Sequence, residues 1–168
     1  KRLSSDREIG CLLSGGLDSS LVSSILAREL SKTGKKLHTF SIGFPDSTDI
    51  VYARKVAEHI GSEHHEYIIQ YEDALKEIEN VIKTIESYDT TTVRASIGNY
   101  LLGKYISKNS KAKVIFNGDG SDELCGGYLY MNYCKDIIEF DKETRRLLED
   151  IHLFDVLRSD KCISSNGL

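Results

Sequence analysis

Short apolar runs alternate with segments of helical periodicity over most of this sequence. Residues 9–13 (IGCLL) form a continuous apolar run, which is typical of a strand buried on both faces. Apolar side chains then recur at helical spacing over residues 21–30, and further strands are predicted at 37–42, 66–70 and 113–116. Strands joined by helices in this way form a parallel sheet that is covered by helices on both faces. The sequence therefore predicts an α/β fold with a parallel twisted sheet.

The remaining predicted helices differ in how clearly they are bounded. Asp49 is a plausible cap for a helix over residues 51–60 that ends at Gly61. Longer amphipathic helices follow at 74–85 and 97–106. We expect residues 1–128 to form the α/β core and 129–168 to begin a helical part, helical and strongly charged over 135–158. No structure is predicted for 164–168.

Composition narrows the class of protein. A chain of 168 residues has room for one domain, and a net charge of −4 argues against a role in binding nucleic acid. No apolar run reaches membrane-spanning length, so we expect no membrane partner. The four cysteines have no CxxC spacing, which favours reduced thiols in a cytoplasmic protein. Because the first residue is Lys1, we expect the sequence to be a piece of a longer polypeptide.

The pair His64-His65 invites comparison with a metal site. Neighbouring residues on a strand point to opposite faces of the sheet. These two imidazoles are therefore poorly placed to share one ion, and we expect structural or surface roles for them.

Two unusual loops follow predicted strands. Residues 14–20 (SGGLDSS) come after the first strand, and residues 118–124 (GDGSDEL) come after the fourth. Ligands of open parallel sheets bind at the carboxyl ends of the strands, where the strand order reverses. Glycine lets backbone amides approach a ligand, and amides at a helix N-terminus attract anions. The loops therefore predict a phosphate site.

A carboxylate at a phosphate site requires a cation. Asp18 would repel a bare phosphate, whereas a Mg²⁺ ion between the carboxylate and the phosphate attracts both. Asp122 is the obvious second carboxylate ligand for that ion. The structural alternatives are a helix cap for Asp18 and an acidic turn for the second loop. Neither GxxxxGK[ST] nor GxGxxG after the first strand is present, so the common mononucleotide and dinucleotide fingerprints are absent.

The first loop resembles that of the ATP pyrophosphatase (PP-loop) family, whose members cleave ATP between its α- and β-phosphates. Further segments are similar to the synthetase domain of glutamine-dependent asparagine synthetases, which implies an adenine nucleotide alpha-hydrolase-like fold. The segments that carry this resemblance are FSIGFPDSTDIVYARKVAEHIGSEHHEY, IESYDTTTVRASIGNYL, IFNGDGSDELCGGYLYM and LFDVLRSDKCISSNGL. SGGLDSS alone would also fit argininosuccinate, GMP and NAD synthetases, whereas the joint pattern is more specific.

The resemblance implies a role for each matching residue. Those of the pyrophosphate loop are Ser14, Gly15, Gly16, Asp18 and Ser19, with Asp18 and Asp122 as Mg²⁺ ligands. Those that hold the adenosine part of ATP are Leu12, Ile42 and Gly118. Those at the aspartyl-adenylate side are Thr91 and Arg94, while Asp119 belongs to the acyl-transfer step. Asp119 stands where many members have Glu, which keeps the charge and shortens the reach. We also expect Tyr128 at the mouth of the site.

The implied reaction is ATP-dependent synthesis of asparagine from aspartate through β-aspartyl-AMP. It releases AMP and pyrophosphate and takes its nitrogen from glutamine-derived ammonia. A glutaminase domain would precede Lys1 and further synthetase residues would follow Leu168, so the chain is expected to be incomplete and impaired by itself. Alternatives are another PP-loop adenylating enzyme, such as a β-lactam-forming relative, or a nucleotide-binding fragment without turnover. A homodimer is one assembly that we consider.

Overall fold

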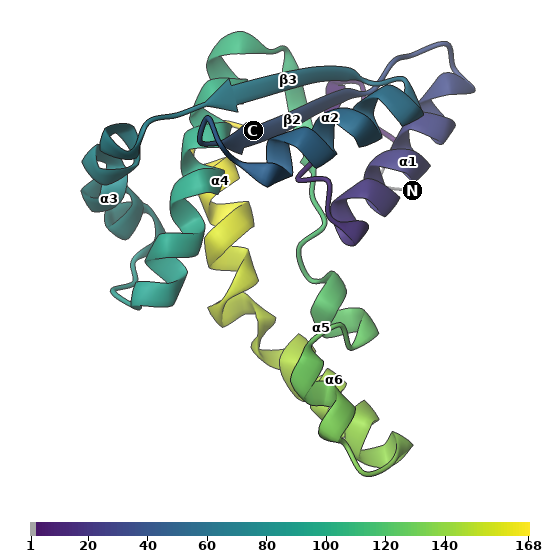
Figure 1. Ribbon diagram of the computed structural model, residues 1–168, viewed down its shortest axis with the longest axis vertical. Helices are drawn as coiled ribbons and strands as arrows, with labels where there is room; N and C mark the ends of the chain where they lie inside the picture. Colours follow the sequence, from purple (N-terminus) through teal and green to yellow (C-terminus); the bar gives the residue numbers. More distant parts are fainter. Residues whose placement is uncertain (1–2) are drawn as a thin grey trace.

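A computed structural model describes residues 3–168 and contains a four-stranded parallel sheet (Figure 1). The strands are β1 (Glu8–Leu12), β2 (His38–Gly43), β3 (Glu63–Ile68) and β4 (Ala112–Phe116). Their order is β3-β2-β1-β4, and every neighbouring pair is parallel. The predicted parallel α/β fold is confirmed. Strand β3 ends two residues before its predicted end, and it begins three residues before its predicted start because its first three residues (EHH) lack the apolar side chains that mark a strand.

The helices follow the predicted order and differ mainly at their ends. They are α1 (Leu17–Ser31), α2 (Thr48–Ile60), α3 (Tyr71–Ile85), α4 (Thr90–Asn109), α5 (Ser121–Cys125), η1 (Leu129–Tyr133), α6 (Ile137–Asp150), η2 (Ile151–Leu153), η3 (Val156–Lys161) and α7 (Cys162–Ser164). Ser47, not Asp49, is the N-cap of α2, whereas Gly61 ends that helix in the left-handed conformation as predicted. Asp89 caps α4 by accepting a bond from the amide of Thr92, so this helix begins earlier than its apolar spacing suggests.

Alternation along the strands supplies both faces of the sheet with apolar side chains. Ile9 and Cys11 of β1 pack with α1 on one face, and Leu13, just after the strand, packs against α2. Leu12 and Phe40 point to the other face, where they pack against α4 and α7. Helix α3 lies outside α4 and contacts it through a smaller apolar cluster. The predicted coverage of both faces is therefore confirmed.

The C-terminal residues leave the sheet and then return to it. Helices α5 and α6 extend away from the sheet as an arm, and η3 and α7 come back beside α4 (Figure 1). Cys162 and Ile163 are buried, and Leu168 packs against the same apolar cluster as Leu12. The expectation that residues 164–168 lack structure is wrong, because Ser164 ends α7, residues 165–167 form turns and Leu168 packs on the sheet. Residues 155–168 are called the return segment below.

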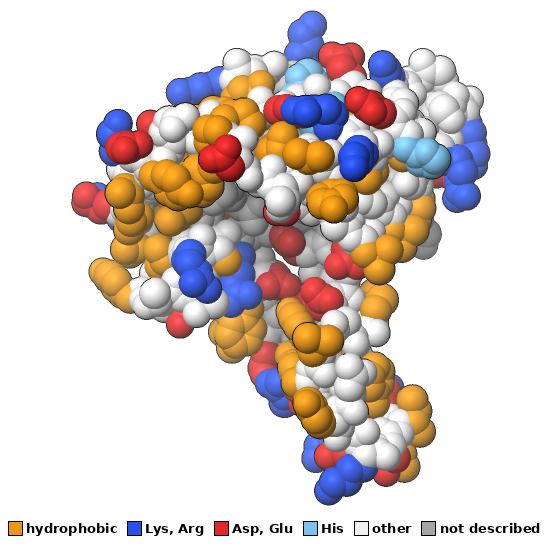
Figure 2. Space-filling view, in the orientation of Figure 1, with side chains coloured by type: hydrophobic (Ala, Val, Ile, Leu, Met, Phe, Trp, Pro, Cys, Tyr) orange, Lys and Arg blue, Asp and Glu red, His pale blue; other side chains and the backbone are white. Residues whose placement is uncertain are grey.

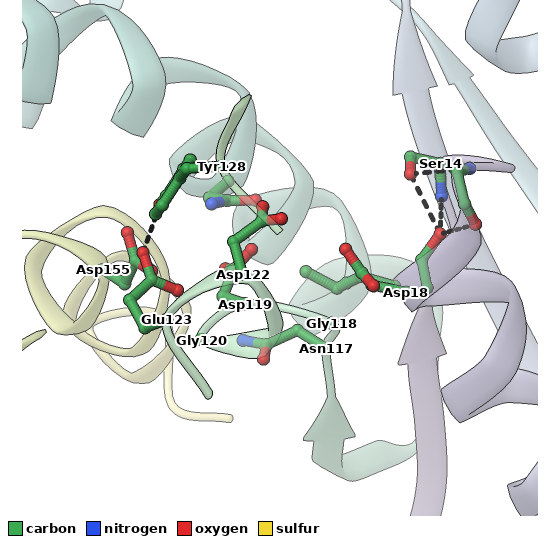
Figure 3. A pocket seen from close by; sticks show the side chains of 14 residues that line it. Ser14, Asp18, Asn117, Gly118, Asp119, Gly120, Asp122, Glu123, Tyr128 and Asp155 are labelled. Atoms are coloured by element: carbon green, nitrogen blue, oxygen red, sulfur yellow. Dashed lines mark hydrogen bonds between the residues drawn. The ribbon is translucent and has the colours of Figure 1, made fainter. Parts of the chain in front are cut away.

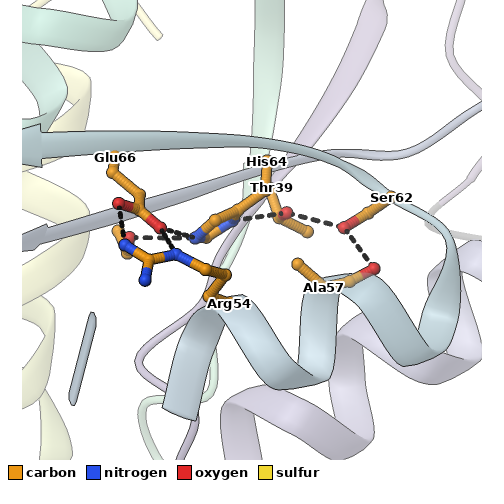
Figure 4. A network of polar contacts seen from close by, with 7 residues as sticks. Thr39, Arg54, Ala57, Ser62, His64 and Glu66 are labelled. Atoms are coloured by element: carbon orange, nitrogen blue, oxygen red, sulfur yellow. Dashed lines mark hydrogen bonds and ion pairs between the residues drawn. The ribbon is translucent and has the colours of Figure 1, made fainter. Parts of the chain in front are cut away.

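A polar network ties the edge strand β3 to α2 and β2 (Figure 4). Arg54 of α2 donates two bonds to the Glu66 carboxylate, at 2.9 and 2.8 Å. His64 contacts the hydroxyls of Thr39 and Ser41, at 2.9 and 3.2 Å, and its burial lowers its pKa. The neighbouring His65 stacks instead on Phe40, which belongs to the opposite face. The two histidines therefore point to opposite faces, as predicted.

Two further expectations concern thiols and membranes. All four cysteines are free, as the sequence predicts for reduced thiols. Among residues 3–168, no helix is both long and apolar enough to cross a membrane.

Candidate functional site

The carboxyl ends of β1 and β4 enclose a cavity of about 300 Å³ (Figure 3). Strand β1 has β2 on one side and β4 on the other, so the strand order reverses at β1 and the loops that follow β1 and β4 diverge there. The predicted residues that line the cavity are Leu12, Ser14, Gly16, Asp18, Ser19, Gly118, Asp119, Asp122 and Tyr128. The two predicted loops therefore share one site.

The loop after β1 is held in shape by its own hydroxyls. The Ser14 and Ser19 hydroxyl oxygens lie 2.9 Å apart, and the amides of Ser14 and Gly16 donate to the Ser19 and Ser14 hydroxyls. Gly15 has a φ of +85°, and a Cβ there would lie 2.5 Å from the backbone nitrogen of Ala53 in α2. The tight turn thus needs glycine both for its backbone conformation and for its contact with α2.

The N-terminus of α1 opens into the cavity without a side-chain cap. Gly16 is the N-cap residue, and within residues 3–168 no side chain bonds to the first-turn amides. Asp18 lies in the first turn and lines the cavity, so the interpretation of Asp18 as a helix cap is wrong. Amides left without a protein partner, together with the helix dipole, make this end of α1 suited to an anion.

The loop after β4 packs closely against that same helix end. A Cβ at Gly118 would lie 2.9 Å from the backbone nitrogen of Ser19, so a larger residue would push β4 away from α1. Helix α5 begins directly after Gly120 and carries Asp122 in its first turn. Close packing at Gly118 therefore brings Asp122 to the cavity that Asp18 lines.

Asp18 and Asp122 form a pair of carboxylates that suits a hard cation. They approach the cavity from opposite sides (Figure 3). Burial raises the pKa of Asp122, and the negative charges of Asp18 and Glu123 raise it further. A divalent cation would remove this repulsion, and carboxylate oxygens are ligands that Mg²⁺ prefers. The residues present therefore fit the predicted magnesium ion.

Several acidic residues of the cavity wall were not predicted. Glu123 is buried and accepts a bond from the Tyr128 hydroxyl, which raises the pKa of that phenol together with burial. Asp155, just before η3, lies on the same wall, and acidic side chains gather where the arm meets the sheet (Figure 2).

Asp119, which was predicted, lies on this wall too. Burial raises the pKa of Asp119, and the negative charges of Asp160 and Glu123 raise it further. The other lining residues that sequence reasoning missed are Asn99, Asn117 and Gly120.

Glu123 could have been found, because it belongs to the quoted GDGSDEL loop. Asp155 belongs to the quoted segment LFDVLRSDKCISSNGL, but nothing in that segment indicated a place at the site, since only the return of η3 brings it to the wall.

Four predicted site residues do not line the cavity. Gly15 lies behind the loop against α2, and Ile42, near the end of β2, packs in the apolar cluster around Leu12. Thr91 and Arg94 are exposed near the N-terminus of α4. Among the described residues Arg94 makes no ion pair, and the nearby Glu86 pairs with Lys161 instead.

The fold is that of a PP-loop α/β protein, and solved structures share it. The ammonia-dependent NAD synthetase of Campylobacter jejuni matches 97% of this chain and 84% of its own, with a TM-score of 0.50 and 18% identity. The U34-tRNA thiolase NcsA of Methanococcus maripaludis matches 99% of this chain and 67% of its own, with a TM-score of 0.51 and 18% identity. At this identity the likeness shows the fold alone.

Sequence comparison narrows this class to one family. The family model for asparagine synthase matches residues 1–158, so the chain belongs to the asparagine synthase family. Over its whole length it is 51% identical to the glutamine-hydrolysing asparagine synthetases of Bos taurus and Homo sapiens, and 52% identical to that of Gallus gallus. The chain spans 30% of the length of these relatives.

Proposed function

We propose that this chain supplies the nucleotide-binding part of a ligase that makes asparagine from aspartate and ammonia with cleavage of ATP. The observation that carries this proposal is the shared cavity, where an uncapped helix N-terminus meets the carboxylates of Asp18 and Asp122. Membership of the asparagine synthase family supports aspartate as the substrate that ATP activates.

ATP binds with its phosphates at the N-terminus of α1. The first-turn amides and the hydroxyls of Ser14 and Ser19 donate to oxygens of the β- and γ-phosphates. Leu12 and Gly118, which line the cavity, hold the adenosine part. A contact with Ile42 requires the adenosine to extend beyond the cavity toward the end of β2. Mg²⁺ held by Asp18 and Asp122 would neutralise part of the phosphate charge, which favours departure of pyrophosphate.

The first chemical step is attack by the side-chain carboxylate of aspartate on the α-phosphorus of ATP. A bond from the carboxylate oxygen to phosphorus forms, the bond to the β-phosphate oxygen breaks, and β-aspartyl-AMP and pyrophosphate result. Arg94 pairs with a carboxylate or phosphate through its planar guanidinium, and Thr91 adds a hydroxyl on the aspartate side. Because both are exposed on α4, this role requires the substrate to extend from the cavity toward that helix.

In the second step ammonia attacks the acyl carbon and AMP leaves. The attacking nitrogen must lose a proton, and we assign its acceptance to the Asp119 carboxylate, whose raised pKa makes it a stronger base than an exposed aspartate. Glutamine hydrolysed by a glutaminase domain elsewhere in the full-length protein supplies the ammonia.

The test is aspartate-dependent pyrophosphate release from Mg-ATP and ammonia by the full-length protein. We expect Asp18→Asn to lower the rate by about 100-fold or more, because it removes charge from the metal and phosphate site. Asp49→Asn is the matched control, since Asp49 lies in the first turn of the neighbouring helix α2, is exposed and does not line the cavity. We expect its rate to stay within twofold.

Two results would contradict the proposal. Pyrophosphate release that does not depend on aspartate would show a different acyl substrate, and full activity of Asp18→Asn would remove Asp18 from the site. The same assay on residues 1–168 by themselves separates a catalytic part from one that binds Mg-ATP without turnover.

A further inference from the structure

Three side chains with metal-binding atoms meet at the amino ends of β2 and β3. His38 begins β2, and it pairs in register with Glu63, which begins β3. His65 lies two residues after Glu63 and therefore points to the same face. The three residues each offer a ligand atom within one small cluster. The nucleotide cavity lies at the other end of this parallel sheet.

The distances within this cluster suit a small transition-metal ion. The Nδ1 atom of His38 lies 3.2 Å from Nε2 of His65. Oε1 of Glu63 lies 3.8 Å from the first nitrogen and 3.7 Å from the second. A point equidistant from these three atoms is about 2.1 Å from each, which is the usual length of zinc bonds to imidazole nitrogen and carboxylate oxygen.

A fourth residue prepares His38 for this role. Nε2 of His38 lies 2.9 Å from Oε1 of Glu8, at the start of β1. The Glu8 carboxylate favours the tautomer in which Nε2 carries the proton, and in that tautomer the lone pair of Nδ1 is free to bind an ion beside His65 and Glu63. A carboxylate behind a ligating histidine is the usual support of zinc-bound imidazoles.

The simpler interpretation is a hydrogen bond between the two histidines with no ion. It accounts for the separation of 3.2 Å between the nitrogens, but it gives no role to the Glu63 carboxylate, which lies beyond hydrogen-bond distance of both. Lys35 and Lys36 line a cavity beside Glu8 and His38, and their charge opposes a cation. The carboxylates of Glu8 and Glu63 offset that charge, and all three proposed ligands are reachable from solvent.

We propose that His38, Glu63 and His65 bind one zinc ion, with water in the remaining position, and that Glu8 orients His38. The ion joins the amino end of the edge strand β3 to β2. Two imidazoles and one carboxylate favour zinc over Mg²⁺, which prefers oxygen ligands alone. This site is separate from the nucleotide cavity and does not depend on the proposed function.

The test is zinc titration of the intact, chelator-treated protein in excess Mg²⁺, followed by calorimetry. We expect one equivalent of zinc per chain and a rise in melting temperature, because the ion binds only the folded protein. His65→Gln should weaken zinc binding at least tenfold and abolish the visible absorption of bound Co²⁺. His59→Gln is the matched control, because His59 is an exposed histidine on α2. This variant should bind zinc with the same affinity as the unsubstituted protein, called the parent below.

Glu63→Gln tests the site in case a histidine variant fails to fold. The Glu63 side chain is 54% exposed, so its replacement leaves packing intact while removing one ligand. We expect at least tenfold weaker zinc binding with an unchanged melting temperature in chelator. Absence of stoichiometric zinc binding by the parent, or equal affinity in the parent and Glu63→Gln, would overturn the proposal.

Discussion

Gly15 and Gly16 are neighbours in the same loop, yet the structure makes very different demands on them. Gly15 has a positive φ and lies against the backbone of α2, where a Cβ would come within 2.5 Å of Ala53. Gly16 has a φ of −70°, and the nearest atom to a Cβ there is the Ser14 hydroxyl oxygen at 3.4 Å. Only Gly15 therefore fixes the shape of the loop through its lack of a side chain.

We expect Gly15→Ala to lower the free energy of unfolding by about 3 kcal/mol. A left-handed backbone costs an alanine about 1–2 kcal/mol, and overpacking against α2 adds about 1–3 kcal/mol. Gly16→Ala, the matched control, should change stability by less than about 1 kcal/mol. Urea denaturation of both variants measures the difference. Equal losses would show that the turn does not need glycine at position 15.

Most of the predicted residues that line the cavity belong to the two continuous motifs SGGLDSS and GDGSDEL. Each motif follows a strand, and β1 and β4 are neighbours in the sheet, so Asp18 and Asp122 reach one cavity. Thr91 and Arg94 were assigned by resemblance, and the structure leaves them exposed outside the lining. Asp155 could not be predicted, because it reaches the cavity only through the fold of the return segment.

Among the secondary-structure elements, α5 and the start of η3 meet at the acidic wall. Asp155 lies next to Glu123 of α5 there. Burial is the main cause that raises the pKa of Asp155 to about 6, and the negative charges of Glu123 and Asp119 add to it. Arg158 opposes this rise through an ion pair at 3.4 Å. The charged form of Asp155 therefore weakens the contact between these two elements.

We expect Asp155→Asn to stabilise the ligand-free protein at pH 7 and to leave its stability at pH 4 unchanged. An ordinary aspartate has a pKa of 3.8, so between about pH 4 and 6 the folded state holds more protons than the unfolded state, and stability falls as pH rises. The gain at pH 7 is about 1 kcal/mol after allowance for solvent screening. Denaturation at both pH values measures it, with the exposed Asp46→Asn as control. A variant that loses stability at pH 7 would contradict the prediction.

Element boundaries were predicted well where apolar spacing marks them and poorly where polar residues begin an element. Strand β3 opens with the residues EHHE, in which His64 bonds to hydroxyls of β2 and Glu66 bonds to Arg54 of α2. Helix α4 opens with TTTVRAS, and its start depends on the cap by Asp89. The polar contacts of β3 join residues distant in sequence, so periodicity cannot reveal them. The Asp89 cap is local, but it lies outside the apolar pattern that predicted the helix.

At the scale of the whole molecule, residues of α7 and Leu168 cover the face of the sheet that carries Leu12 and Phe40. Ile163 of α7 is only 7% exposed and packs with Leu12, Phe40 and Ile106, which come from β1, β2 and α4. The same return segment carries Asp155 to the cavity wall. Burial of Ile163 therefore links the stability of the sheet to the shape of the cavity at the carboxyl ends of β1 and β4.

We expect Ile163→Ala to lower the free energy of unfolding by about 3 kcal/mol, since it removes a buried side chain from a packed cluster. Ile138→Ala is the matched control, because Ile138 on α6 is 76% exposed, and its effect should stay below about 0.5 kcal/mol. Urea denaturation measures both, and Mg-ATP titration should show weaker binding only for Ile163→Ala. A stability loss without any change in Mg-ATP affinity would show that the return segment supports the sheet but not the cavity.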